Sequence, residues 1–190
     1  WLDQYSQGLI VEKEFLEKVD WEKNWGYPFD LYRGILHLAR ARRLRIIGLN
    51  APIDVVNQIA RKGLSTLTPQ DRSRLAADFH QDDPAHREYL RSQFDYHPQE
   101  NIKNFETFLE SQAAWEETMS ETLARTAATL SAGQQILVLI GKGHIVHHFG
   151  VPKLTEMRTN QPFRTVIPVP FDYPIRSLDP ALADYICITE

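Results

Sequence analysis

Apolar residues recur at helical spacing along most of this chain. The longest such pattern, with steps of mostly three and four residues, runs from about residue 99 to 130. It predicts one long amphipathic helix whose inward face carries a single polar residue, Gln112. Shorter patterns and start signals predict further helices over 12–20, 30–43 and 52–62 and from Thr68 and Asp83 onward.

Short apolar segments bounded by turn residues predict strands between these helices. Residues 136–140 are five consecutive apolar residues that end at Gly141, a pattern typical of a strand covered on both faces. Strands are also predicted at 45–49, 164–169 and 185–188. Strands separated by helices imply βαβ units. We therefore expect one α/β domain with a mostly parallel central sheet flanked by helices.

Composition narrows the class of protein. The 190 residues are 43% hydrophobic and 24% charged, as in an ordinary globular domain. A net charge of −4 argues against a broad basic surface for nucleic acid. The cluster Arg40, Arg42, Arg43 and Arg45 ends a predicted helix, and its plain interpretation is that the cations complement the helix dipole. Cys187 is the single cysteine, so an internal disulfide is excluded.

Two loops follow predicted strands directly and are the first candidates for a site. Parallel sheets bind ligands beyond the carboxyl ends of their strands. Asn50 follows residues 45–49, and Gly141, Gly143 and His144 follow residues 136–140. The glycines permit a tight turn with positive φ, and a predicted helix begins just after them. His144 at this position can titrate or bind a metal, or it can simply bond a backbone group of the turn.

His147 and His148 follow His144 at helical spacing. On a helix, residues three and four positions apart share a face, so these imidazoles could hold a metal or a porphyrin iron. Gly150 and Pro152 interrupt such a helix, and the chain has no Glu beside His144 as a zinc-protease motif requires.

Two further side chains have a structural and a functional interpretation. A buried Gln112 needs hydrogen-bond partners, either within the core or in a pocket beside the two loops. Tyr32 is either a phenolate ligand for iron or an aromatic ring packed against Trp21 or Trp25.

A set of short segments taken in order resembles the ChaN-like, iron-regulated haem-binding family, which belongs to a wider group with the erythromycin esterases and the Tiki/TraB proteins. The segments that carry the resemblance are Leu2-Asp3-Gln4-Tyr5, Gly26-Tyr27 with Leu31-Tyr32, Leu49-Asn50-Ala51-Pro52, Gly63-Leu64, Phe94 with His97, Gln112 with Trp115, Glu116 and Met119, Gly141-x-Gly143-His144, and Gly150-Val151-Pro152. Family members usually begin with a strand and a Gly-Glu-x-His segment. This chain therefore resembles the family domain without its N-terminal strand and helix.

The resemblance implies a haem-binding protein for iron or haem acquisition, storage or trafficking. In some members haem lies at a subunit interface with tyrosine as the iron ligand, and some members are membrane-anchored lipoproteins. It therefore implies haem as cofactor and partner, a homodimer, and membrane association through an N-terminal anchor. We expect Tyr32 and His144 as iron ligands, with Tyr96 and Tyr89 as other tyrosine candidates. The expected haem-binding residues are His144, Tyr32, Gly141, Gly143, Asn50, Gln112 and His148.

The alternative is a hydrolase related to the erythromycin esterases and Tiki proteins. It would be metal-assisted or would use His144 as a general base. A third interpretation is a non-catalytic scaffold in which His144 affects stability only. We assign no catalytic residue on the sequence.

Overall fold

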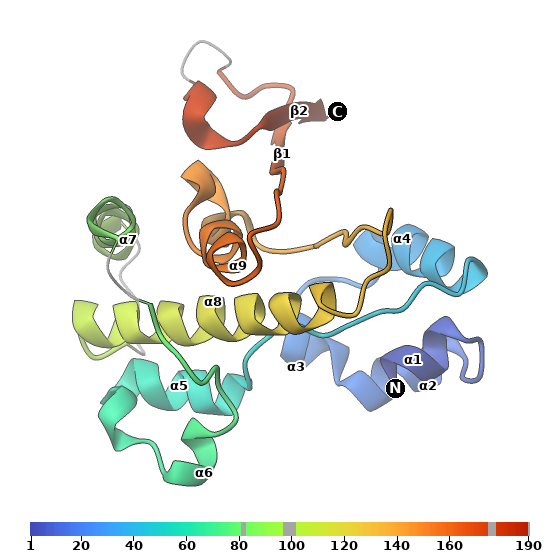
Figure 1. Ribbon diagram of the computed structural model, residues 1–190, viewed down its shortest axis with the longest axis horizontal. Coiled ribbons are helices and arrows are strands. Elements are labelled where there is room, and N and C mark those ends of the chain that lie inside the picture. The colour runs from blue at the N-terminus through green and yellow to red at the C-terminus, as the bar shows by residue number, and fades with distance from the viewer. Residues whose placement is uncertain (81–82, 97–101, 175–177, 190) are drawn as a thin grey trace. The chain divides into compact units, whose positions relative to one another are not determined.

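The chain divides into two compact units, Trp1–Gly48 and Leu49–Glu190 (Figure 1). The computed structural model describes residues 1–80, 83–96, 102–174 and 178–189. No helix within these ranges combines the length and apolar character that crossing a lipid bilayer requires.

The first unit is built from four helices around an aromatic core. They are α1 (Leu2–Ser6), α2 (Glu12–Val19), α3 (Trp21–Trp25) and α4 (Asp30–Ala41). The buried centre comprises Tyr5, Ile10, Phe15 and Phe29, with the Tyr5 and Phe15 rings stacked at 4.2 Å. The helices α2 and α4 lie where the sequence predicts them. Between them lies α3, in which Trp21 and Trp25 are one turn apart and pack ring against ring at 5.7 Å.

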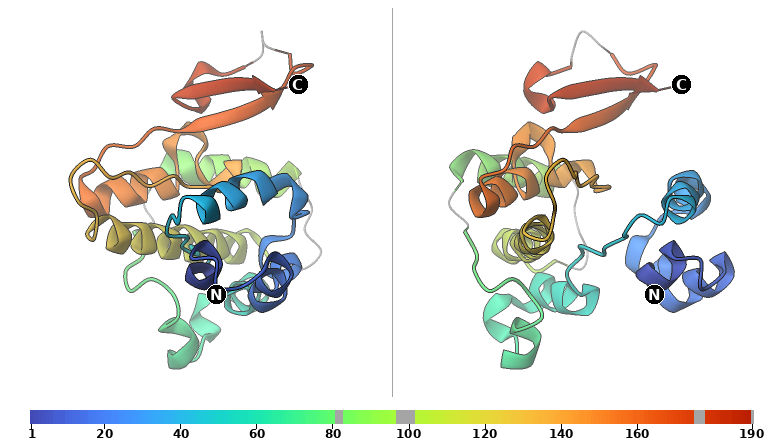
Figure 2. Two further views of the ribbon diagram at one scale, coloured as in Figure 1. Left: turned by 90° about the vertical axis from the view of Figure 1, so that its right-hand side faces the viewer. Right: turned by 45° about the vertical axis from the view of Figure 1, so that its right-hand side comes forward.

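The second unit is organised around the helix α8 (Phe105–Ala127), with α5 (Ile53–Lys62) and α9 (Val151–Thr159) on opposite sides of it (Figures 1 and 2). On one side Val55, Val56 and Ile59 pack with Ala114. On the other side, Met119 and Leu123 of α8 pack with Val151 of α9 in a separate cluster. The other helical elements of this unit are η1 (Leu64–Thr66), α6 (Pro69–Arg72), α7 (Pro84–Tyr96), η2 (Lys142–His144), η3 (Val146–His148) and η5 (Pro180–Leu182).

The long helix is confirmed, but it begins and ends inside the predicted range. A capping box starts it, in which Asn104 Oδ1 accepts from the Thr107 N–H at 3.0 Å and Thr107 Oγ1 accepts from the Asn104 N–H at 3.2 Å. The prediction of one inward polar residue is wrong. Gln112 is only half-buried. The buried polar side chains of α8 are Thr107, Ser111, Glu116, Glu117, Thr118 and Ser120.

The fold class is α/β, with a parallel two-stranded sheet flanked by helices. The strands β1 (Val166–Pro170) and β2 (Tyr185–Thr189) pair in register from Val166 with Tyr185 to Pro170 with Thr189. They occupy the positions that the sequence predicts for its last two strands. Ile167 and Val169 face inward and pack with Val146 and Ala183, which gives β1 its alternating burial.

The two strands predicted at 45–49 and 136–140 are wrong within the described residues. Neither segment has regular secondary structure, and neither forms backbone hydrogen bonds with another described segment. Val138 and Ile140 pack against the Met119 cluster, whereas Leu137 is 78% exposed. An apolar run alone is therefore insufficient, because a strand also needs a neighbouring backbone with which to pair.

Candidate functional site

His144 is held by a buried carboxylate of α8. The turn η2 follows Gly141, whose carbonyl accepts from the His144 N–H at 3.1 Å. The imidazole points to Glu116, and Nδ1 lies 3.1 Å from Oε1. The side chain of Glu116 is 4% exposed and that of His144 is 23% exposed. The turn thus fixes the backbone of His144, and Glu116 rather than a backbone group fixes its ring.

Gly150 makes room for the Glu116 carboxylate. Its backbone is left-handed, with φ of 60° and ψ of −121°, and it directly precedes α9. A Cβ atom at this position would lie 2.7 Å from Cδ and Oε1 of Glu116. Glycine is therefore required here both by its conformation and by the close approach of the carboxylate.

His86 faces the same carboxylate from the first turns of α7. Its Nε2 lies 3.7 Å from Glu116 Oε1, too far for a hydrogen bond. This nitrogen is buried and has no hydrogen-bond partner among the described residues. Burial lowers the pKa of His86, against the opposing effect of Glu116. Glu116 is therefore close to two imidazoles. It bonds that of His144, whereas that of His86 stays neutral down to a lower pH than an exposed histidine would.

Aromatic rings cover this cluster on the His86 side. The Phe149 ring stacks on the His86 imidazole at 5.1 Å, and Tyr89 lies 6.0 Å from Phe149. Burial raises the pKa of Tyr89, and the negative charge of Glu116 acts in the same direction. The Tyr89 phenol is therefore held in its neutral form. We define the Glu116 cluster as Glu116, His144, His86, Tyr89 and Phe149.

The bond to Glu116 determines what His144 can do. A carboxylate only accepts hydrogen bonds, so in a neutral imidazole Nδ1 carries the proton and Nε2 carries the lone pair. Among the described residues, no group hydrogen-bonds Nε2 of His144. Metal-ligating histidines are commonly oriented in this way, through a carboxylate on the other ring nitrogen. The same arrangement also suits a general base.

The other two histidines of the segment do not join His144. His148 Nε2 lies 3.1 Å from Asp184 Oδ2, and His147 Nδ1 lies 3.8 Å from Asp179 Oδ2. The expected helix is wrong here: η2 and η3 are separate 3-10 turns, and His147 and His148 are left-handed with φ of 55° and 60°. Across the described parts of the chain, no group of three His, Cys, Asp or Glu side chains is placed to hold a metal ion.

The remaining expected residues are distributed over both units. The backbone of Gly141 and Gly143 lacks the positive φ that was expected of it. Asn50 is exposed in the second unit, and Gln112 is half-buried on α8. Tyr32 belongs to the first unit, where its ring meets Trp25 edge-on at 5.2 Å and Trp21 at 5.9 Å, as the packing interpretation predicts. Of the other residues in the resemblance, His97 lies outside the described residues.

Sequence reasoning missed Glu116 and His86 as partners of His144. A signal for Glu116 exists, because it follows Gln112 by four residues and precedes Met119 by three, which places it on the inward stripe of α8. A buried carboxylate requires a cationic or hydrogen-bonding partner. His86 carries no comparable signal, because its position depends on how α7 docks.

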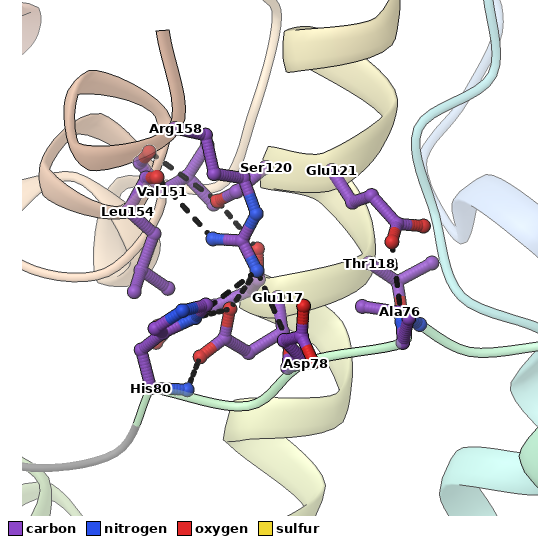
Figure 3. Close-up of polar contacts among 12 residues, drawn as sticks. Ala76, Asp78, His80, Glu117, Thr118, Ser120, Glu121, Val151, Leu154 and Arg158 are labelled. Carbon is purple, nitrogen blue, oxygen red and sulfur yellow. Dashed lines mark hydrogen bonds and ion pairs between the residues drawn. The ribbon is translucent and has the colours of Figure 1, made fainter. Parts of the chain in front are cut away.

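A second buried carboxylate, Glu117, is neutralised within the protein (Figure 3). Its side chain is 1% exposed and forms an ion pair with Arg158 of α9, which is 13% exposed. It also accepts from the backbone N–H of His80, and Arg158 donates to the carbonyl of Asp78 at 3.2 Å. Through these contacts the Glu117 carboxylate of α8 connects the segment before α7 with α9. Glu117 thus has its counter-charge inside the fold, whereas the ion-pair partners of Glu116 among the described residues are imidazoles only.

Comparison with known proteins identifies one family. Residues 1–154 match the model of the family described as haem-binding uptake, Tiki superfamily, ChaN. The match includes all residues of the Glu116 cluster. No curated protein matches the chain. No solved structure matches it either.

Proposed function

Because the chain belongs to the haem-binding uptake family ChaN of the Tiki superfamily, we propose that it binds haem and acts in the acquisition, storage or trafficking of iron or haem. The family match is the observation that carries the proposal. It extends over 1–154 and so includes both residues expected to ligate iron, Tyr32 and His144.

His144 is our choice for the iron ligand in the second unit. Haem iron needs one Lewis-basic axial atom, and a neutral imidazole supplies it. The 3.1 Å contact with Glu116 orients the ring and leaves the lone pair on Nε2. The side chain of His144 is 23% exposed, so part of the imidazole is open to solvent.

The surroundings of His144 fit the group chemically. A porphyrin requires apolar contacts around the axial base. Phe149 and Tyr89 supply aromatic surface within the Glu116 cluster, and the neutral form of His86 adds no charge there. When bound, haem would supply a redox-active iron centre, and Glu116 would keep His144 in the tautomer that ligates it.

Tyr32 stays the alternative ligand, in the first unit. Tyrosine phenolate is an established haem ligand. The rings of Trp25 and Trp21 beside Tyr32 would give a porphyrin an aromatic surface there. The other expected residues, Asn50, Gln112, Gly141, Gly143 and His148, stay predictions of the haem-binding set.

A hydrolase is the second candidate, and the Glu116–His144 pair is the observation that favours it. A histidine oriented by a buried carboxylate is the arrangement of a general base. This candidate predicts ester or amide hydrolysis that is lost in both His144→Ala and Glu116→Gln.

The resemblance also predicts a homodimer and membrane association. Both are tested by sedimentation of the protein with and without haem and by flotation with lipid vesicles. A dimer that forms only with haem would place the ligand near the subunit interface.

The deciding experiment is a haem titration followed by the Soret absorbance. We expect saturable binding that His144→Ala weakens by about tenfold or more with a shifted Soret maximum. The matched control is His147→Asn, which removes an imidazole that contacts the Tyr89 and Phe149 rings but not Glu116, and keeps a residue that tolerates left-handed backbone. If Tyr32→Phe rather than His144→Ala changes the spectrum, the ligand is Tyr32. If the wild-type protein shows no saturable binding, the haem proposal is rejected and the esterase assay follows.

A further inference from the structure

A basic pocket lies in the first unit, lined by residues that the haem proposal does not use. It measures about 520 Å³ and is lined by Gln7, Gly8, His37, Arg40, Ala41 and Arg43. Gln7 and Gly8 come from the turn after α1, and the other residues come from α4 and its end. Two arginines and one histidine therefore line the same open pocket.

The two arginines have no carboxylate partner within the described part of the chain. Neither Arg40 nor Arg43 forms an ion pair there. The imidazole of His37 is engaged by Glu12, with Nε2 2.8 Å from Oε2, and Glu12 is also bonded by Arg33 at 3.0 Å. Hydrogen bonds from Arg33 and His37 lower the pKa of Glu12. The carboxylate of Glu12 is thus already bonded by Arg33 and His37. Among the described residues, no carboxylate compensates the charges of Arg40 and Arg43.

The arginines are not needed to cap α4. The last carbonyls of the helix accept backbone N–H groups: Leu38 from Arg42 at 3.0 Å, Arg40 from Arg43 at 3.1 Å and Ala39 from Leu44 at 2.8 Å. The side chains of Arg40 and Arg43 are therefore not needed for capping. The helix dipole favours cations at this end of α4, but it does not explain why two of them line a pocket.

Arg43 occupies a position where glycine is usual. Its φ is 51°, the left-handed conformation that closes many helices. Gly8 has φ of 78°, and a Cβ there would lie 3.9 Å from Nε of Arg40. The Arg40 guanidinium also lies over the Tyr5 ring, at 5.1 Å from its centroid. Arg43 therefore occupies a position where the backbone conformation favours glycine. The Tyr5 ring orients the second arginine, Arg40, by stacking.

We propose that this pocket binds the oxyanion of a small molecule that carries carboxylate or phosphate groups. Guanidinium groups bind both oxyanions through paired, charge-assisted hydrogen bonds. The Gln7 amide adds a neutral donor at the rim. The concave form suits a small ligand, whereas a nucleic acid would use all four arginines of the 40–45 segment.

The test is isothermal titration calorimetry of the full chain with pyrophosphate and with citrate, at about 0.15 M salt to screen weak contacts. Pyrophosphate represents phosphate ligands, and citrate represents carboxylate ligands. We expect one-to-one saturation by at least one of them, and the tighter one identifies the ligand class. We expect Arg43→Gln to weaken binding by about tenfold. The matched control Arg42→Gln removes the same charge from the same helix end without lining the pocket, and it should change binding less than twofold.

Arg43→Gly separates loss of binding from loss of folding. Because the position is left-handed, this variant should keep or raise the melting temperature while it loses binding like Arg43→Gln. His144→Ala should leave the anion titration unchanged, so this proposal and the haem proposal can fail independently. The proposal is overturned if neither probe saturates, or if Arg42→Gln weakens binding as much as Arg43→Gln. It is also overturned if a single-stranded oligonucleotide binds with equal dependence on Arg40, Arg42, Arg43 and Arg45.

Discussion

Glu116 has two imidazoles and one glycine around its carboxylate, and each contact has a distinct physical role. His144 supplies the hydrogen bond at 3.1 Å, and His86 lies at 3.7 Å without one. Gly150 supplies the space. A carboxylate that is 4% exposed must keep such partners, because desolvation of an unpartnered charge is costly.

Gly150→Ala should destabilise the protein and displace Glu116. The new Cβ would meet the carboxylate at 2.7 Å, and the left-handed backbone disfavours any side chain. We expect a loss of about 1–3 kcal/mol in the free energy of unfolding, measured by urea denaturation. The control is Gly143→Ala, where an added Cβ meets nothing within 4 Å. Equal stabilities of the two variants would contradict the packing described for Gly150.

His86 should make the ligand-free protein sensitive to acid. Burial lowers its pKa in the folded state, whereas a histidine in the unfolded chain titrates near about 6.5. Below that pH the unfolded chain takes up a proton that the folded protein refuses, so the free energy of unfolding falls as the pH falls.

His86→Gln removes this component, so its free energy of unfolding should depend less on pH between about 6.5 and 5 than that of the wild type. Urea denaturation at several pH values measures the two slopes, with His147→Asn as the control imidazole. The prediction fails if His86→Gln and the wild type lose stability in parallel.

At the scale of elements, α8 carries two adjacent buried carboxylates with opposite arrangements. Glu117 is paired with Arg158, which joins α8 to α9. Glu116 instead contacts imidazoles, and the side chain of its hydrogen-bond partner His144 is 23% exposed. The first arrangement stabilises helix packing, and the second suits a ligand site.

Arg158→Met should destabilise the second unit strongly. It leaves Glu117, which is 1% exposed, without its counter-charge. We expect a loss of about 3–5 kcal/mol, measured by thermal or urea denaturation. Adding Glu117→Gln should recover part of this loss, because no buried charge then remains. The matched control is Arg74→Met, whose exposed pair with Asp54 should contribute no more than about 1 kcal/mol. A similar effect of both methionine variants would contradict the difference in burial.

The elements show how far the sequence predicts this fold. Helices α4, α5 and α8 follow from apolar spacing, and β1 from its alternation, because these signals are local. The segment 136–140 has an equally strong strand pattern but lacks a paired neighbour among the described residues. His144 was found from its position after a strand-like run. Its partner His86 depends on the docking of α7, and no spacing within the sequence encodes that.

At the scale of the whole molecule, the chain consists of two compact units with separate cores. The aromatic cluster around Phe15 belongs to one, and the clusters around α8 belong to the other. Residues 44–52 between α4 and α5 have no regular secondary structure. The basic pocket thus belongs to the first unit, and the Glu116 cluster belongs to the second.

Trypsin should cut first in the segment that joins the units. Arg42, Arg43 and Arg45 are exposed and lie at the end of α4 or just after it. We expect a transient fragment that begins between residues 43 and 46, identified by mass spectrometry. Replacing the three arginines by glutamine should slow this cut. A first cut after Arg125, within α8, would contradict the division into units.

The apolar segment 136–140 also bears on handling of the protein. It has no charged residue and no proline, its backbone groups have no backbone partner among the described residues, and Leu137 is 78% exposed. Such a segment can act as a template on which other chains add strands, so we expect it to promote aggregation when the protein is concentrated. A lysine in place of Leu137 would act as a gatekeeper against this process while leaving the inward Val138 and Ile140 in place.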